Sequence, residues 1–228
     1  MPLNKSRGNM YDFCTHTHTH IGGKCPHACS YCSVQSMAKR YPVLKAKYSG
    51  PLHLIEKEFS VNYGSGKTIF IENCNDMFAD DVPVPFIERI MDHCKAWPEN
   101  TYVFQTKNPK RAMTCRFPEK LILGTTIETN REILCSDAPD PSDRADGIGA
   151  TSSNIKTFIT IEPIMDFDVD LFSLLIIGAN PNFVNIGADS KGHNLPEPSY
   201  DKVMDLINIL TMFGIEIRKK VNLERLKK

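Results

Sequence analysis

The chain has 228 residues, of which 41% are hydrophobic and 24% charged, and its 27 basic and 27 acidic side chains cancel. This is the composition of an ordinary globular protein. The zero net charge argues against a protein that coats nucleic acid through bulk electrostatics, although it leaves room for a local basic strip. No apolar run reaches the roughly 18 residues of a membrane span, and the first residues lack the apolar segment of a secretory signal. We therefore expect a cytoplasmic protein whose eight cysteines are thiols or metal ligands, not disulfides.

Short apolar strands alternate with helical patterns along the chain. The pattern predicts strands at 11–18, 68–72, 102–106, 121–127, 157–162, 183–187 and 215–217, and helices at 82–97 and 200–213. Residues 168–177 fit either a helix or a strand, and 137–154, rich in Asp, Pro, Ser and Gly, predicts a loop. This alternation indicates parallel βα units. Six or seven strands are too few for an eight-fold barrel, so we expect an α/β fold with a partial (βα)6-type TIM barrel. It would form one domain over 1–228, with 1–9 flexible and 218–228 a basic tail.

Polar residues follow nearly every predicted strand. In chain order they are Cys74, Asn75 and Asp76, then Gln105 and Lys107, then Thr126 and Glu128, then Glu162, and finally Asp189. Active sites of such barrels lie at the carboxyl ends of the strands. We therefore expect these side chains to surround a common site.

Three cysteines, Cys25, Cys29 and Cys32, form a CxxxCxxC triplet, with the aromatic Tyr31 just before the last of them. Thiolates this close cannot all point into a core, so we expect them to converge on a metal or a cluster. Cubane iron–sulfur clusters are normally held by four cysteines. Three protein ligands would leave one iron open to a substrate or cofactor.

A structural zinc site is the alternative, with His27 or Cys14 as the fourth ligand. Such sites usually take their ligands from two short pairs separated by a spacer. No second pair is present, because Cys74, Cys94, Cys115 and Cys135 are each isolated. This alternative predicts a zinc-stabilised module that binds nucleic acid or protein without catalysis.

The triplet with its aromatic residue resembles the signature of the radical S-adenosylmethionine (radical SAM) enzymes. Segments 15–18, 76–78, 106–111, 161–163 and 187–193 are similar to those of a group of short radical SAM proteins from bacteria and phages, a resemblance that covers most of 10–226. It implies that the three cysteines bind a [4Fe-4S] cluster and that SAM chelates the open iron. An electron from a donor such as flavodoxin or ferredoxin would then cleave SAM to methionine and a 5′-deoxyadenosyl radical.

The reaction implied by the resemblance begins with hydrogen abstraction from an unactivated carbon. Its outcome, as an isomerase, a lyase or a transferase, stays open. We expect the open side of a short barrel to admit a large substrate, such as a nucleotide, a nucleic acid base in DNA or RNA, or a polypeptide. The basic groups at 39–47, 107–111 and 218–228 could serve such a substrate, although each is also typical of a solvated surface.

The resemblance also implies roles for the residues at the strand ends. Thr126, Glu128 and Glu162 would hold the ribose or methionine part of SAM, and further cofactor contacts would come from Tyr31, Asn75, Asp76, Gln105 and Asp189. The glycine-glycine-glutamate element of the family is not present as such, because residues 74–76 occupy its place. Lys107 would pair with a carboxylate of methionine or substrate, or be a solvated surface lysine. Cys74 would donate a hydrogen atom to a product radical, or simply pack against SAM.

Cys14, His16, His18 and His20 alternate with threonines, so on one strand they would share a face. Imidazole and thiolate suit zinc, copper or iron. We expect this face to line the barrel interior, with His16 and His18 contacting SAM or substrate and His20 in the following loop.

Overall fold

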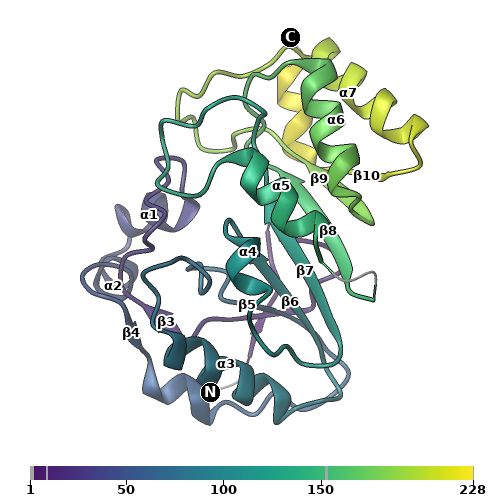
Figure 1. Ribbon diagram of the computed structural model, residues 1–228. Coiled ribbons are helices and arrows are strands. Elements are labelled where there is room, and N and C mark those ends of the chain that lie inside the picture. The colour runs from purple at the N-terminus through teal and green to yellow at the C-terminus, as the bar shows by residue number, and fades with distance from the viewer. Residues whose placement is uncertain (1–2, 9, 152–153, 228) are drawn as a thin grey trace.

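The computed structural model describes residues 3–8, 10–151 and 154–227. In these residues one eight-stranded sheet has the order β1-β2-β5-β6-β7-β8-β9-β10, and all neighbours are parallel except the edge pair β1–β2 (Figure 1). The strands are β1 (Asn4–Lys5), β2 (His16–His18), β5 (Thr68–Ile71), β6 (Thr101–Thr106), β7 (Leu121–Thr126), β8 (Lys156–Ile161), β9 (Phe183–Ile186) and β10 (Glu216–Lys219). A second, two-stranded sheet pairs β3 (Ile21–Gly22) with β4 (His53–Leu54).

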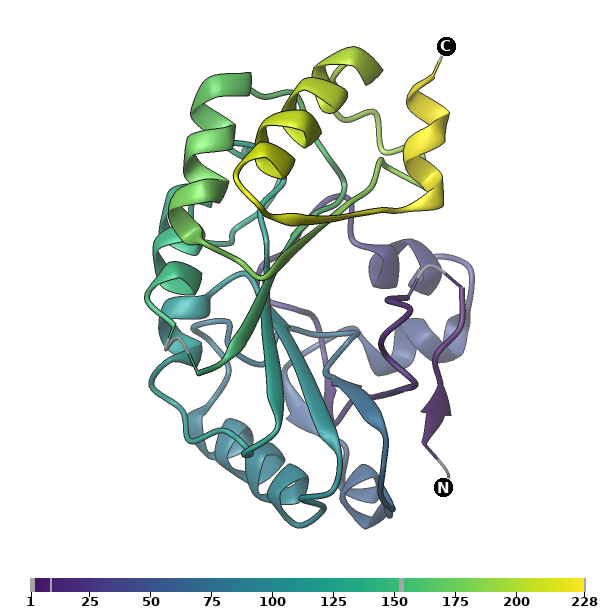
Figure 2. The ribbon, with the colours of Figure 1, turned by 90° about the vertical axis from the view of Figure 1, so that its right-hand side faces the viewer.

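Helices cover one face of the large sheet, and the segment before β2 packs on the other. The covering helices are α3 (Val84–Lys95), α4 (Pro109–Ala112), α5 (Pro141–Gly149), α6 (Val169–Ala179) and α7 (Tyr200–Met212). Figure 2 shows α5 and α6 on the left of the curved sheet and the N-terminal segment on its right. The remaining helices are α1 (Ser33–Ala38), α2 (Pro42–Lys47) and the 3-10 turns η1 (Glu56–Ser60) and η2 (Val221–Leu226). No helix in the described ranges has the length and hydrophobicity to span a bilayer. The predicted α/β partial barrel is confirmed.

The register divides the strand residues between two cores. Ile69, Tyr102 and Leu121 lie side by side on the helix-covered face, where Ile87 and Ile90 of α3 pack in the same core. On the opposite, inner face Phe70 and Val103 are neighbours, and Phe158 pairs with Phe183. The segment before β2 fills this inner face, because Tyr11, Phe13 and Cys14 pack against those aromatic rings. The barrel interior is therefore closed at its amino end by aromatic side chains.

The histidines after residue 15 lie on the helix-covered face, so the prediction that they line the interior is wrong. His16 and His18 pair in register with Ile69 and Ile71 of the outer core. His18 is buried, with its ring 5.3 Å from that of Tyr63. The strand begins only at His16, after a turn, which places Cys14 in the inner core and separates it from the histidines.

Residues 137–154 contain helix α5, so the prediction of a loop for the whole segment is wrong; residues 152 and 153 lie outside the described part. Pro141 opens the helix and Asp143 stands in its first turn, both favourable at a helix N-terminus. Ala145 and Ile148, three residues apart, face the core. The Pro and Asp residues that predicted a loop therefore stand at the start of a helix.

The two chain ends are more ordered than the sequence predicts. Asn4 and Lys5 pair with Thr17 and His16, so part of 1–9 belongs to the sheet, while residues 1, 2 and 9 lie outside the described part. In the expected basic tail, 218–219 end β10 and 221–226 form η2, whose Leu223 and Leu226 are buried in the outer core; residue 228 lies outside the described part. Residues 168–177, which fitted either element, form helix α6.

Candidate active site at the carboxyl ends of the strands

The cysteine triplet lies on the loop that joins the β2–β3 region to α1. Cys25, Cys29 and Cys32 are all partly buried, and every cysteine of the chain is a free thiol. Burial raises the pKa of the Cys25 thiol to about 12 and also raises the pKa of Cys32. Among the described residues, no three His, Cys, Asp or Glu side chains converge on one point that could hold a single metal ion. A cubane cluster presents separate iron corners to its cysteines, so its ligands need no such single point.

A second loop lies across the cysteine loop. The Ser30 N–H donates to the carbonyl of Cys135 at 2.9 Å, and the Asp137 N–H donates to the carbonyl of His27 at 2.8 Å. Between them, the Ser136 hydroxyl lies 3.0 Å from the Cys29 sulfur. These contacts, which the sequence does not signal, place a polar group directly on one candidate cluster ligand.

Asp76 anchors the cysteine loop to the sheet. Its carboxylate is buried and accepts hydrogen bonds from the Thr106 hydroxyl at 3.0 Å and the Lys107 N–H at 2.7 Å, while His27 Nε2 lies 2.8 Å from the same oxygen. Burial opposes ionisation, but His27 and these donors lower the pKa of Asp76 below its ordinary value. The neighbouring Asn75 donates to the carbonyl of Gly23 at 3.2 Å. Both predicted cofactor residues thus hold the cysteine loop in place, and their contact with SAM stays a prediction.

Glu128 is the centre of a buried charged cluster. Its carboxylate pairs with Lys107 and with Arg144, the latter at 2.8 Å, and accepts a hydrogen bond from the Tyr31 hydroxyl. Burial would raise the pKa of Glu128, but the charges of Lys107 and Arg144 outweigh it and lower the pKa to about 2. Lys107 Nζ also lies 5.3 Å from the centre of the Tyr31 ring. The structure therefore brings three predicted site residues together beside the cysteine loop.

Arg144 of α5 is the member of this cluster that the sequence did not reveal. Its side chain is fully buried, and it donates to the carbonyls of Pro139 at 2.6 Å and Thr126 at 3.1 Å. Its Nη2 atom has no hydrogen-bond partner among the described residues. A buried, unpaired guanidinium donor is costly unless a ligand or water satisfies it. The start signal of α5 at Asp140-Pro141 was the only sequence feature that could have pointed to this residue.

A row of hydrogen-bonded side chains crosses the inner face of the sheet below this cluster. Gln105 donates to the Thr126 hydroxyl at 2.7 Å and accepts from the Tyr11 hydroxyl at 2.7 Å. Tyr11 is also 2.6 Å from the Thr160 hydroxyl. The predicted residues Gln105 and Thr126 are therefore neighbours on the inner face; Gln105 is the last but one residue of β6 and Thr126 is the last residue of β7.

The far edge of the sheet holds the last two predicted acids. Glu162 pairs with Lys220 at 2.7 Å and accepts a hydrogen bond from Asn222 at 2.7 Å, while Asn222 Oδ1 is buried with no partner among the described residues. Asp189 binds His193, whose other ring nitrogen lies 3.1 Å from the Ser36 hydroxyl of α1. The contact between His193 and Ser36 joins the loop after β9 to α1, the helix that follows the cysteine loop.

Cys74 follows β5 in the same loop as Asp76 and is partly buried. Burial raises the pKa of its thiol, which lies near Tyr48 and Thr19. Its role as a hydrogen donor stays a prediction.

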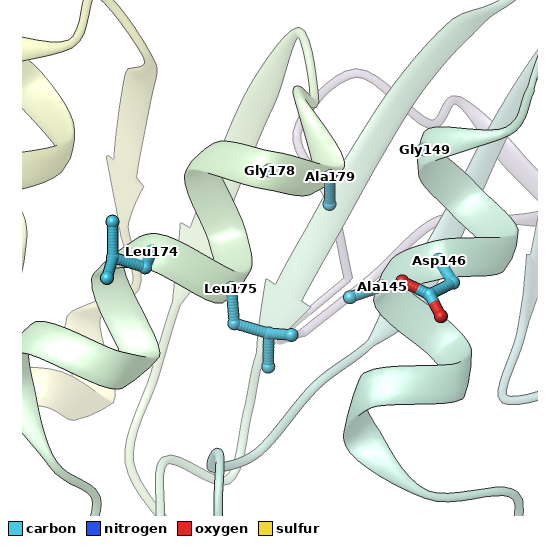
Figure 3. Close-up of a pocket in the computed structure, with 7 residues that line it drawn as sticks. All are labelled: Ala145, Asp146, Gly149, Leu174, Leu175, Gly178 and Ala179. Atoms are coloured by element: carbon cyan, nitrogen blue, oxygen red, sulfur yellow. The ribbon is translucent and has the colours of Figure 1, made fainter.

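The groove drawn in Figure 3 lies elsewhere, between α5 and α6, and is lined largely by small side chains such as Ala145, Gly178 and Ala179. It belongs to the outer helical layer and contains none of the predicted site residues.

Solved structures share this fold at low sequence identity. A spore photoproduct lyase complexed with dinucleoside spore photoproduct superposes with a TM-score of 0.63 at 10% identity, over 93% of this chain and 78% of that one. A radical SAM methyltransferase from Sphaerobacter thermophilus gives 0.54 at 13% identity, over 94% and 69%. SuiB of Streptococcus suis, bound to S-adenosylmethionine, gives 0.53 at 8% identity, over 92% and 51%. The chain therefore has the fold found in radical SAM enzymes.

The model of the DUF5131 family, described as a protein of unknown function, matches residues 10–197. The chain belongs to this family. No curated protein matches it.

Proposed function

We propose that this protein is a radical SAM enzyme whose Cys25, Cys29 and Cys32 hold a [4Fe-4S] cluster. The observation that carries the proposal is the position of the triplet: three free, partly buried thiols on one loop at the carboxyl end of the sheet. The fold shared with radical SAM enzymes supports it. When bound, the cluster and SAM would supply a 5′-deoxyadenosyl radical that abstracts hydrogen from a substrate carbon.

The buried charges beside the loop suit the methionine end of SAM. Lys107 and Arg144 share a single carboxylate, Glu128, so these three side chains together carry one excess positive charge. The free Nη2 of Arg144 adds a donor without a partner among the described residues. A ligand carboxylate would satisfy both the charge and the donor. In this proposal the positive charge of Lys107 attracts the carboxylate of the cofactor. Glu128 and Tyr31 hold the Lys107 side chain in place.

The polar row on the inner face and the far edge suit the nucleoside end. Thr126 and Gln105 offer hydroxyl and amide groups near the strand ends. Asn222 Oδ1, beside Glu162, is an acceptor without a partner among the described residues, which a ribose hydroxyl would satisfy. Asp189 would complete this edge.

The reaction that follows hydrogen abstraction could be an isomerisation, an elimination or a group transfer. A nucleotide or a nucleic acid base is the substrate class we favour, and the spore photoproduct lyase structures, solved with a dinucleoside lesion, are compatible with it. A one-electron donor such as flavodoxin or ferredoxin would reduce the cluster. The phage and bacterial setting implied by sequence resemblance belongs to the same proposal.

Iron and sulfide analysis of protein reconstituted without oxygen tests the cluster assignment. We expect about four irons and four sulfides per chain, and a strong loss in each of Cys25→Ala, Cys29→Ala and Cys32→Ala. Cys115→Ala removes a partly buried cysteine away from the loop and should keep full iron. Stoichiometric zinc in place of iron, dependent on the same three cysteines, would replace this proposal with the zinc-stabilised binding module.

A further inference from the structure

An uninterrupted basic segment follows the candidate cluster loop, although the whole chain is neutral. No Asp or Glu occurs between Asp12 and Glu56, and the basic residues of that stretch are Lys24, Lys39, Arg40, Lys45 and Lys47. All but the first lie within 39–47, which runs from the C-cap of α1 through the whole of α2 and which we call the basic arm. Within this segment itself no carboxylate offsets the positive charge.

Three of the four cations of the basic arm are exposed, whereas Lys47 is half-buried with its ammonium 5.3 Å from the centre of the Tyr48 ring. Lys39, Arg40 and Lys45 face solvent, and in the described part of the chain none of the three forms an ion pair. Helix α2, described in full, buries none of its six residues. Tyr41 and Val43 stand among the cations with 58% and 79% of their surface exposed. Among the described residues the exposed Tyr41 ring contacts no other aromatic ring, and exposed cations stand beside it.

The basic arm is held firmly against the cysteine loop. The Gly23 N–H donates to the carbonyl of Lys47 at 2.9 Å, and the Lys24 N–H donates to the carbonyl of Gly50 at 3.0 Å. A side chain at Gly23 would meet the Pro51 carbonyl at 2.3 Å, and one at Gly22 would meet the Lys47 carbonyl at 3.0 Å. The backbone of the two segments is therefore in close contact.

The arm also lies close to the candidate cluster, because helix α1 joins the two. Cys32 is the N-cap of α1, so Lys39 follows it by seven residues of mostly helical chain. At 1.5 Å per residue this places Lys39 about 10 Å from Cys32. A polymer bound along the arm would pass close to the candidate active site.

We propose that the basic arm binds single-stranded nucleic acid, with Lys39, Arg40 and Lys45 on the phosphates and Tyr41 stacked on a base. This deepens the proposed function, on which its catalytic meaning rests, because it names the substrate that the site would receive. Proteins that bind single strands combine a basic track with aromatic platforms. An acidic peptide would use the cations but would leave Tyr41 without a role.

Fluorescence anisotropy of a labelled single-stranded DNA oligonucleotide tests this inference, using the whole 228-residue chain as purified, without added iron or SAM. We expect salt-dependent binding that K39A/R40A/K45A weakens at least tenfold. Removing three phosphate contacts should also lower the slope of log K against log salt by about 2. Tyr41→Ala should weaken binding about fivefold or more while leaving that slope unchanged.

The matched control removes three exposed lysines that have acidic partners on other surfaces. Lys95, Lys110 and Lys120 pair with Asp92, Asp143 and Glu99, so K95A/K110A/K120A should bind within twofold of the wild type. Equal losses in both triple variants, or no binding by the wild type at low salt, would overturn the inference. So would binding to anionic lipid vesicles or to polyglutamate without binding to the oligonucleotide.

The two proposals fail separately, because the binding assay needs no cluster. Protein that takes up iron but does not bind the oligonucleotide would contradict nucleic acid binding by the basic arm and leave the radical SAM proposal unaffected. Protein that binds the oligonucleotide but takes up no iron would contradict the radical SAM proposal and leave nucleic acid binding by the basic arm unaffected.

Discussion

His27 Nε2 lies 2.8 Å from Asp76 Oδ2, and this contact joins the cysteine loop to the end of strand β5. Both side chains are buried, and the same oxygen also accepts from the backbone N–H of Lys107 after β6. One carboxylate thus fixes the loop that carries the three cysteines to two neighbouring strands. The position of the candidate cluster depends on Asp76.

Replacing Asp76 by Asn should therefore weaken both the fold and metal uptake. Because the amide cannot accept these hydrogen bonds with a full negative charge, we expect unfolding in urea to become easier by about 1–3 kcal/mol. Iron content after reconstitution should fall with it. Asp81→Asn changes an exposed carboxylate and serves as the control. Unchanged stability and full iron in Asp76→Asn would contradict the anchoring role.

Glu128 compensates two buried cations at once. Neutralising it in Glu128→Gln leaves Lys107 and Arg144 facing each other's charge without a counter-ion, so we expect a loss of about 3–5 kcal/mol in unfolding free energy. Replacing Lys107 by Met in the same variant should recover part of that loss. Glu132→Gln, at an exposed site, is the comparison. A Glu128→Gln protein as stable as the wild type would show that the cluster is not coupled in this way.

His18 should make the protein less stable in mild acid. Burial, followed by the effect of His20, lowers the pKa of His18 to about 3, whereas the unfolded value is near 6.5. The unfolded chain therefore binds the proton first, and stability falls as the pH drops from about 6.5 towards 3, by up to about 1.4 kcal/mol per pH unit. Urea unfolding at pH 7, 6 and 5 measures the slope.

In His18→Gln that slope should be smaller, while the exposed His53→Gln should keep the wild-type slope. Identical slopes in all three proteins would mean that His18 accepts a proton in the folded state as readily as in the unfolded state.

Ser136 should tune the candidate cluster through Cys29. Once iron has displaced the thiol proton, the Cys29 sulfur can only accept, so the Ser136 hydroxyl at 3.0 Å would donate to it. Hydrogen bonds to cluster sulfurs influence the reduction potential. Because they stabilise the more negative, reduced state, Ser136→Ala should have a more negative midpoint potential in a redox titration. Ser30→Ala, which changes an exposed residue of the cysteine loop next to Cys29, should match the wild type; an equal shift in both variants would rule out this specific contact.

The sequence was informative where one local pattern decides the structure. Strands such as 68–72 and 121–127 are apolar runs with clear ends, and the observed strands differ from them by one residue. The Cys25–Cys32 spacing likewise depends only on adjacent residues. Of the residues expected at the carboxyl edge of the sheet, Lys107 and Glu128 are in direct contact, and their role in a common site stays a prediction.

The errors arose where packing decides between equivalent local patterns. Alternation at 14–20 predicts that residues share a face, but which face is buried under α3 depends on where the strand begins. Arg144 reaches Glu128 only because α5 packs against the end of β7, a relation that no local pattern contains.

Electron paramagnetic resonance of the dithionite-reduced, anaerobically reconstituted protein, recorded with and without SAM, tests the central claim most directly. We predict a reduced [4Fe-4S] signal that changes shape when SAM is added and is absent in Cys29→Ala. A reduced-cluster signal that SAM leaves unchanged, or no cluster signal in the wild type, would contradict the account.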